Sequence, residues 1–503
     1  MGKRNYPVPL EELAFMEVCQ MVRGAGGNWT RRLRSAADTG HSSWLQEVKS
    51  VEEECVLVRA HLATLPVPLV SEYIIFYAFQ EFIKLIEHYY HHDPRPLISR
   101  IIDRQVHESV CINMLKAVIL PCISKCDISV TYSSFVQELL IKFLYAIPNI
   151  KTLILPSLQR PRHVQLLVER IQILTHLENF SFHTCCTTET IIQLSKYCPH
   201  MKKISVQGSK RVDDGSVEHL LKMRNLLSLN IAETSISGNR YAALLPGLPE
   251  IRDVIWFRPI EPVLGNLTAC LPSVVAFIGV ISDAKLLVQK CPNITHLLLY
   301  SPSQDISDLG ELKNVVSITI QNCSYTEIRF SDVIRRSGST LENLVTVDVD
   351  NIHLDDVINY CTGLRSLCIN YCHVTCTEMF HPELPHFQNL EKLKIIGNGG
   401  EITFCSVLHL YVNLTVLHFV GMKHITDAVI SQIVKAGGFR NLTEFVIDHC
   451  GYVTVETAWL LMQNCPNLTK IGKFNSWHDI NNQELVRFLN FVRRNNVCLT
   501  LHP

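Results

Sequence analysis

CPNITHLLL, at residues 291–299, is one copy of a phrase that recurs along the last two-thirds of this 503-residue chain. It returns as CPHMKKISV at residues 198–206 and as CPNLTKI at residues 465–471. The copies share an apolar residue, two variable residues, an apolar residue, one variable residue and another apolar residue. Self-similarity at a fixed period is typical of a solenoid. The alternation within each copy predicts a strand with one buried face.

The repeat period agrees with this prediction. Successive first apolar positions are 20 to 29 residues apart, which is the period of leucine-rich repeats. We place these fourteen positions at Ile150, Leu177, Met201, Leu226, Ile251, Val274, Ile294, Val315, Leu344, Leu364, Leu390, Leu414, Leu442 and Leu468. Between the copies the apolar spacing becomes helical, as at residues 426–434, where Thr426 is a suitable N-cap. Each unit is therefore expected to be one strand plus one helix.

Cysteines recur at two places in the repeat. One stands before the strand in a Cys-Pro-x-apolar group, and another stands eight positions into the phrase, as at Cys185, Cys323, Cys372 and Cys450. This pattern resembles the cysteine-containing leucine-rich repeats, which are best known from F-box leucine-rich proteins. The resemblance covers roughly residues 147–503. It implies an α/β leucine-rich-repeat solenoid, a horseshoe of about 14 repeats.

We interpret the cysteines as small buried thiols. A zinc site is the alternative, because Cys122 and Cys126 have a loose ligand-like spacing and His88 and His92 are one helical turn apart. No second pair stands where a four-ligand site would need it, so no metal and no cofactor are expected.

Composition and motifs exclude several functions. The chain has 46 Lys and Arg against 47 Asp and Glu, whereas nucleic-acid binding needs a basic surface. It has no apolar run of membrane-spanning length and no signal-peptide pattern, so we expect neither membrane insertion nor export, and a cytoplasmic or nuclear location. No nucleophile elbow, phosphate loop or zinc-protease motif occurs, so we predict that the protein is not an enzyme.

Residues 1–146 lack the phrase and have helical spacing, with a mobile loop expected between Gly24 and Ser43. Leu65, Pro66 and Leu69 are similar to the opening of an F-box, although its later part is missing. Phe15 and Cys19 stand in a stretch similar to an elongin-binding box, with Phe15 in place of leucine. These resemblances imply docking to a Skp-type or elongin-type adaptor and a cullin. The alternative is that the region only caps the solenoid.

The variable positions of the phrase should point out of the sheet on its concave face. They are polar or small on most repeats, but three adjacent repeats would present an apolar patch of a kind that marks binding surfaces. Its residues are Ile255, Phe257, Ile278, Val280, Leu298 and Tyr300. Asp348 and Asp350 would add an acidic spot two repeats further on. A covering segment, or a register slip of one residue, would remove the patch.

These observations lead to one principal hypothesis and one alternative. Residues 147–475 would form the solenoid that binds a target protein, and residues 476–503 a C-terminal cap. With an adaptor on residues 1–146, the protein would be the substrate-recognition subunit of a cullin-type ubiquitin ligase. The alternative is a non-catalytic interaction scaffold unrelated to ubiquitin.

Overall fold

The chain divides into two compact units in the computed structural model. The first comprises residues 8–251, and the second comprises residues 252–503 together with residues 1–7. The structure describes residues 10–39, 41–64, 79–80, 83, 112–113, 115–120, 122–129, 134–158, 160–375, 389–397, 408, 411–477, 482–495, 497 and 499–502.

The first unit begins with two long helices, α1 (Leu10–Thr39) and α2 (His41–Ala63). Trp29 and Arg32 of α1 both bond to Glu54 of α2, through Nε1 and Nη1 respectively, each at 2.6 Å. Arg32 also pairs with Glu47. The mobile loop expected at residues 24–43 is therefore wrong, because this segment is the second half of α1 and the start of α2.

A parallel five-stranded sheet follows, in the order β1-β2-β3-β4-β5. Its strands are β1 (Lys125–Asp127), β2 (Thr152–Leu155), β3 (Asn179–Phe182), β4 (Lys203–Ser205) and β5 (Ser228–Asn230). Its helices are α5 (Ser134–Phe143), α6 (Pro161–Ile171), α7 (Thr188–Tyr197), α8 (Val217–Leu220) and α9 (Gly238–Leu244).

The second unit contains an eleven-stranded parallel sheet, in the order β18-β17-β16-β15-β14-β12-β10-β9-β8-β7-β6. Its first strands are β6 (Asp253–Pro259), β7 (Ala276–Val280), β8 (His296–Tyr300), β9 (Ser317–Ser324), β10 (Asn343–Asp350) and β12 (Ser366–Asn370). The remaining ones are β14 (Lys392–Ile396), β15 (Val416–Val420), β16 (Glu444–Asp448), β17 (Lys470–Gly472) and β18 (Thr500–His502). The short strands β11 (Ile352–His353) and β13 (Val374–Thr375) pair beside it.

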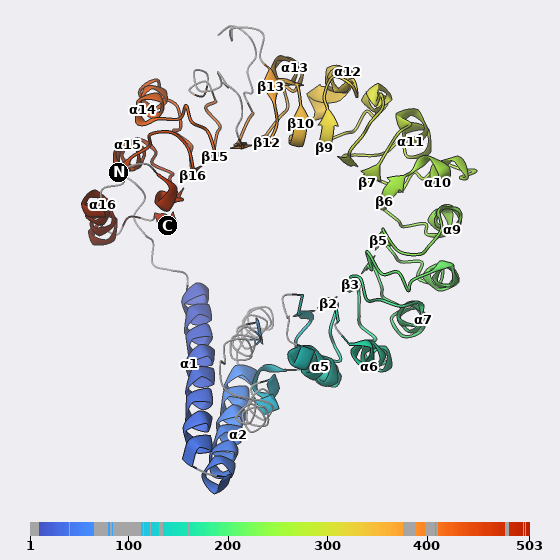
Figure 1. Ribbon diagram of the computed structural model, residues 1–503, viewed down its shortest axis with the longest axis vertical. Coiled ribbons are helices and arrows are strands. Elements are labelled where there is room, and N and C mark those ends of the chain that lie inside the picture. Colours follow the sequence, from blue (N-terminus) through green and yellow to red (C-terminus); the bar gives the residue numbers. More distant parts are fainter. Residues whose placement is uncertain are drawn as a thin grey trace. The chain divides into compact units, whose positions relative to one another are not determined.

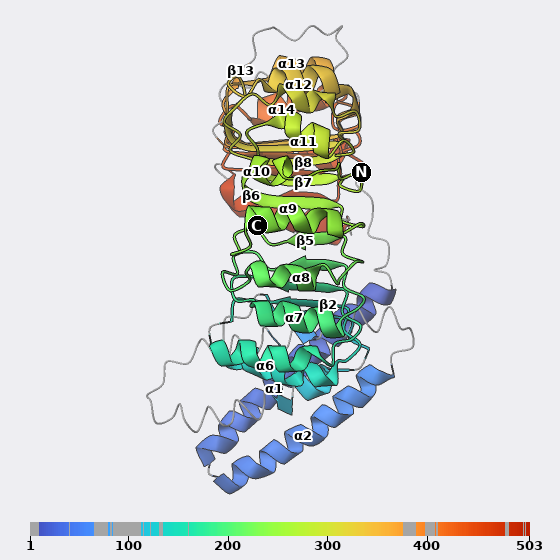
Figure 2. The same ribbon diagram turned by 90° about the vertical axis from the view of Figure 1, so that its right-hand side faces the viewer.

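Helices cover one side of this sheet. They are α10 (Glu261–Gly265), α11 (Ala284–Lys290), α12 (Phe330–Ser337), α13 (Leu354–Tyr360), α14 (Asp427–Lys435), α15 (Val455–Asn464) and α16 (Asn482–Arg494). Within each unit the strands line one side and the helices lie on the other (Figure 1). Figure 2 shows α10 to α13 following one another in steps along the second unit.

The core lies between strands and helices and is built from the apolar positions of the phrase. In β7, for example, Phe277 is fully buried while Ile278 and Val280 are only half-buried. Thr426 Oγ1 accepts a hydrogen bond from the Val429 amide, so it caps α14 as its sequence position predicts. The repeated unit of parallel strand and helix is that of a leucine-rich-repeat fold.

Candidate protein-binding surface

Alternate side chains of each strand point away from the helices, because side chains alternate along a strand. We call the surface that they form the open face. In the second unit, the two central rows of the open face run through Leu298 and Tyr300 of β8. The register of the strands aligns the first row, because it pairs Ile255 with Ile278 and Ile278 with Leu298. The predicted stacking of these three residues is therefore confirmed.

The apolar patch consists of Ile255, Phe257, Ile278, Val280, Leu298 and Tyr300, on β6, β7 and β8. The rings of Phe257 and Tyr300 meet edge to face with centroids 5.1 Å apart, across the intervening strand β7. Aromatic pairs prefer this geometry. Ile255 is only 7% exposed, so the other five residues, which are half-buried, supply the accessible part of the patch.

A bulge in β6 shapes the patch. The register shifts between Trp256 and Pro259, so that Val280 pairs with Pro259. A Cβ on Gly279 would lie 2.0 Å from the carbonyl oxygen of Trp256, so only glycine permits this approach. Gly279, which breaks the apolar pattern of the phrase, thus makes room for the bulge beside Phe257.

One predicted strand register is wrong. Leu344 pairs with Ile318, the second apolar position of its repeat, so the phrase begins at Leu341 and not at Leu344. The start at Leu344 fits the apolar pattern better, because it places Val347 and Val349 at the later apolar positions. The earlier start at Leu341 places Thr346 at such a position, and the burial of Thr346 (1% exposed) nevertheless selects it. Val345 and Val347 therefore occupy the open-face positions that were predicted for Asp348 and Asp350.

Asp348 instead has a left-handed backbone near the end of β10, with a φ of 50°. The same conformation occurs at Asn322 near the end of β9, and at Ser301 and Tyr371 directly after β8 and β12. Gly397, with a φ of 109°, takes this place after β14. Asp348 and Asp350 are both exposed, beyond the two central rows.

The opposite end of the same sheet carries charge. We define the charged group as Lys394, His418, Glu444 and Lys470, on β14 to β17. One oxygen of Glu444 accepts bonds from His418 Nε2 at 2.7 Å and from Lys470 Nζ at 2.5 Å. Burial alone would raise the pKa of Glu444, because it favours the neutral carboxyl group. The hydrogen bonds and charges of Lys470 and His418 outweigh this effect, so the pKa of Glu444 is lowered.

Burial is the largest effect on His418 and lowers its pKa, while the bond to Glu444 opposes this. Sequence reasoning missed the charged group as well as Val345 and Val347. The charged residues occupy variable positions of their phrases, so they become visible only when every repeat is aligned in the correct register.

The open face of the first unit is polar. His183 Nε2 lies 2.8 Å from Ser205 Oγ and 3.2 Å from Ser181 Oγ, and Asn230 donates to Gln207 at 3.3 Å. Burial lowers the pKa of His183. These side chains hydrogen-bond one another, so this face lacks the apolar character of β6 to β8.

The structure describes the residues predicted for adaptor docking only in part. Leu65, Pro66 and Leu69 lie outside the described residues. Phe15 and Cys19 lie in α1, but their side chains are outside the described part of the structure.

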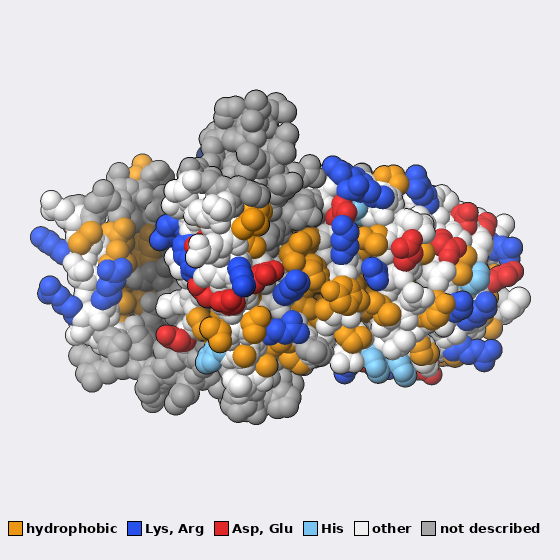
Figure 3. Space-filling model, turned by 90° about the horizontal axis from the view of Figure 1, so that it is seen from below, with side chains coloured by type: hydrophobic (Ala, Val, Ile, Leu, Met, Phe, Trp, Pro, Cys, Tyr) orange, Lys and Arg blue, Asp and Glu red, His pale blue; other side chains and the backbone are white. Residues whose placement is uncertain are grey.

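Helix α2, in the same region, exposes apolar side chains. Leu45, Val56 and Leu57 are 52%, 64% and 69% exposed. The view from below in Figure 3 shows hydrophobic side chains gathered on that face of the molecule, interspersed with charged ones.

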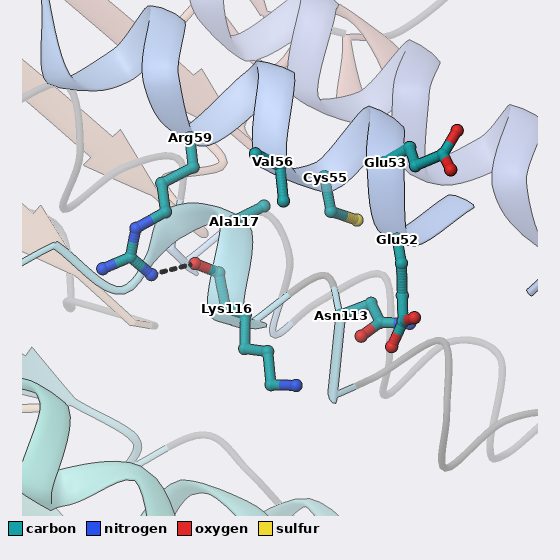
Figure 4. Close-up of a pocket in the computed structure, with 8 residues that line it drawn as sticks. All are labelled: Glu52, Glu53, Cys55, Val56, Arg59, Asn113, Lys116 and Ala117. Atoms are coloured by element: carbon teal, nitrogen blue, oxygen red, sulfur yellow. Dashed lines mark hydrogen bonds between the residues drawn. The ribbon is translucent and has the colours of Figure 1, made fainter. Parts of the chain in front are cut away.

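Val56 also borders a pocket of about 360 Å³ (Figure 4). The other residues that line it are Glu52, Glu53, Cys55, Arg59, Asn113, Lys116 and Ala117. Arg59 closes one side by donating to the Lys116 carbonyl at 2.7 Å.

The pre-strand cysteines behave as the thiol interpretation predicts. Cys198, Cys291, Cys361 and Cys465 are free and buried, and burial raises the pKa of each to about 12. Cys270 is the exception, because it is exposed. Within the described ranges no three His, Cys, Asp or Glu side chains are arranged to hold a metal ion. None of the helices in those ranges is both long and apolar enough to cross a membrane.

Comparison with known proteins gives structural likeness only. No protein-family model and no curated protein sequence matches the chain. The yeast Rad7 and Elc1 complex structure aligns over 81% of this chain and 98% of its own, at 17% identity and a TM-score of 0.38. A leucine-rich-repeat protein of Leptospira interrogans aligns over 71% of this chain and 91% of its own, at 11% identity and a TM-score of 0.36.

A third likeness is to the functional domain of InlJ from Listeria monocytogenes, which includes a cysteine ladder. It covers 72% of this chain and 69% of that domain, at 10% identity and a TM-score of 0.29. The repeated parallel strands and helices of the chain itself establish a leucine-rich-repeat fold.

Proposed function

We propose that this protein is a non-catalytic receptor that binds a target protein on the concave open face of a horseshoe of about 14 repeats. The observation that carries the proposal is the apolar patch, where Phe257 and Tyr300 meet across β7 while both remain half-buried. Accessible apolar side chains gathered on one surface mark protein-binding sites. Asp348 and Asp350 would contribute from the end of β10.

The second part of the proposal concerns residues 1–146, which would dock a Skp-type or elongin-type adaptor and thereby a cullin. Support comes from the sequence around Leu65 and around Phe15, and from the exposed Val56 and Leu57 of α2. Residues 147–475 would hold the target and residues 476–503 would cap the solenoid. The protein would then be the substrate-recognition subunit of a ubiquitin ligase, acting in the cytoplasm or nucleus.

The adaptor test uses the full chain and purified adaptors. We expect either a Skp-type or an elongin B–elongin C adaptor to bind in isothermal titration calorimetry. Combined alanine substitution of Leu65, Pro66 and Leu69 should abolish Skp binding if the F-box interpretation is right. Substitution of Phe15 and Cys19 tests elongin binding in the same way.

If both variants bind as the wild type does, both motif interpretations are wrong. If neither adaptor binds the wild type, the scaffold alternative is preferred, and residues 1–146 only cap the solenoid.

The target test addresses the patch. Phe257→Asp, Val280→Asp and Tyr300→Asp should leave the circular dichroism spectrum and thermal midpoint nearly unchanged and should weaken co-purification of the target from cells at least about tenfold. Val412→Asp is the matched control, because Val412 is 57% exposed and lies outside the open-face rows. Loss of soluble protein in the three patch variants would mean that these residues belong to the core.

A further inference from the structure

Lys394 is the starting point of a more specific inference. It lies on β14, on the same row of the open face as Leu298, and the ladder pairs it with Cys368 on β12 and His418 on β15. Its side chain is half-buried, yet it has no ion pair among the described residues. A lysine side chain held partly out of water without a counter-charge is a natural site for an anion.

The carboxylates around Lys394 are already engaged. Glu444 accepts bonds from Lys470 and His418, and Glu391 pairs with Arg365 at 2.7 Å. Asp448 lies 3.4 Å from Lys473. Lys392, two residues before Lys394 and on the same side of β14, also lacks an ion pair within the described part of the chain and is exposed. This end of the open face therefore has an excess of positive charge.

The spacing between this charge and the apolar patch is fixed by the sheet. Strand β14 is four strands from β8 in the order β8-β9-β10-β12-β14. At about 4.8 Å per strand the two features lie roughly 19 Å apart. An extended peptide spans that distance with about six residues, at roughly 3.3 Å each. Val345 and Val347 on β10 provide apolar contact along the way.

We propose that the open face of the second unit binds one extended segment of a partner protein, which places an apolar side chain on the apolar patch and an aspartate or glutamate about six residues away on Lys394. This inference rests on the proposed function and names the chemistry of the target. Nucleic acid is a poorer occupant, because it needs an extended basic surface. Here the lysines are confined to one end of an apolar surface, and the chain as a whole has a net charge of −1.

The test selects phage-displayed random 16-residue peptides on the immobilised full-length chain. Wild-type protein should enrich peptides in which an aromatic or aliphatic residue precedes or follows an acidic residue by five to seven positions. Selection on Lys394→Glu should remove the acidic preference. Lys435→Glu should retain it, because Lys435 carries the same charge but lies exposed in the last turn of α14.

Fluorescence anisotropy on an enriched peptide then gives the size of the effect. Lys394→Glu should raise its Kd at least about tenfold in 50 mM NaCl, and the difference from wild type should shrink in 500 mM NaCl, because salt screens the interaction. Replacing the acidic residue of the peptide with glutamine should weaken wild-type binding and leave binding to Lys394→Glu almost unchanged.

Three outcomes overturn the inference: no enriched peptides, an acidic preference that persists in Lys394→Glu, or tight binding of a single-stranded oligonucleotide that depends on Lys394. Enriched peptides that require Phe257 but carry no acidic residue leave the proposed function standing and remove only this inference. Peptides that tolerate both Phe257→Asp and Lys394→Glu contradict both.

Discussion

The strands β6 to β8 and β14 to β17 belong to one sheet and share one backbone pattern, yet their open faces have opposite chemistry. The first group gathers aliphatic and aromatic side chains around Phe257 and Tyr300. In the second group, Lys394 and His418 share the row of Leu298, while Glu444 and Lys470 lie in the neighbouring row, which is that of His296. Both groups keep the same buried rows. The comparison shows that the buried positions maintain the fold while the variable positions are free to define what each part of the surface binds.

The two regions also differ in regularity. Strands β14, β15 and β16 pair residue for residue, while β6 is interrupted by the bulge opposite Gly279. Bulges redirect side chains, and this one lies within the patch. We therefore expect substitutions in the two regions to differ in how strongly they change the stability of the protein.

Gly279→Val should have the largest effect. Its Cβ would overlap the Trp256 carbonyl, so the bulge must open and β6 must shift, at a cost of about 3 kcal/mol or more in the free energy of unfolding. Chemical denaturation followed by circular dichroism measures this. Gly265→Ala is the control, since a Cβ there meets nothing within 4 Å. Equal stability of the two variants would mean that the close approach is absent.

Glu444→Gln should have a smaller effect, confined to the charged end. Loss of the carboxylate weakens the contacts to Lys470 and His418 and should cost about 1 kcal/mol, because the group is part-buried but reached by solvent. The pKa of His418 should fall further, since its bond to Glu444 is what raises it against burial. Histidine NMR during a pH titration measures the change, and an increase in that pKa would contradict the arrangement.

Acidification should loosen the charged end more than the apolar end. Because the pKa of His418 is lower when folded than its ordinary 6.5, the unfolded chain binds more protons between the two values, and stability falls as the pH drops below about 6.5. His418→Gln should flatten this loss. Hydrogen exchange of peptides covering β15 and β16 reports it. His424→Gln, at an exposed histidine of the same repeat, should leave the pH dependence as it is.

Asp348→Gly should give the smallest change, a gain of roughly 0.5 kcal/mol. Asp348 has a φ of 50°, a conformation that glycine adopts without strain. The resulting gain in stability is partly offset by the greater freedom of glycine in the unfolded chain. Thermal denaturation measures it. A clear loss of stability would mean that the backbone at Asp348 is not left-handed.

Much of the fold follows from the sequence because the apolar phrase is long and repeated. Leu297, Leu367 and Phe445 occupy the same buried place in three repeats, and the ladder register aligns them as the phrase predicts. The exception at Leu341 and Leu344 arises because the start at Leu344 gives a complete apolar pattern, whereas the observed start at Leu341 places the polar Thr346 inward. Only packing around Thr346, whose hydroxyl accepts a bond from Cys372 at 3.4 Å, distinguishes them.

The site was less predictable for physical reasons. The sequence places Phe257 and Tyr300 on one face, but their contact across β7 depends on a bulge that no local pattern reveals. The bonds from His418 and Lys470 to Glu444 join residues 26 positions apart, so they require the cross-strand register to be correct throughout. The helical course of residues 24–39 was not predicted because three glycines and three arginines suggest a loop, whereas Trp29 and Arg32 bond this stretch to α2.

Gly279 and Trp256 also limit how this chain could be shortened. Removing the repeat that contains β7 would bring β6 against β8, where Leu299 stands in the place of Gly279. A leucine side chain would then occupy the space that the Trp256 carbonyl needs. These two neighbouring repeats consequently form a matched pair: a deletion, duplication or transplant succeeds only when both move together.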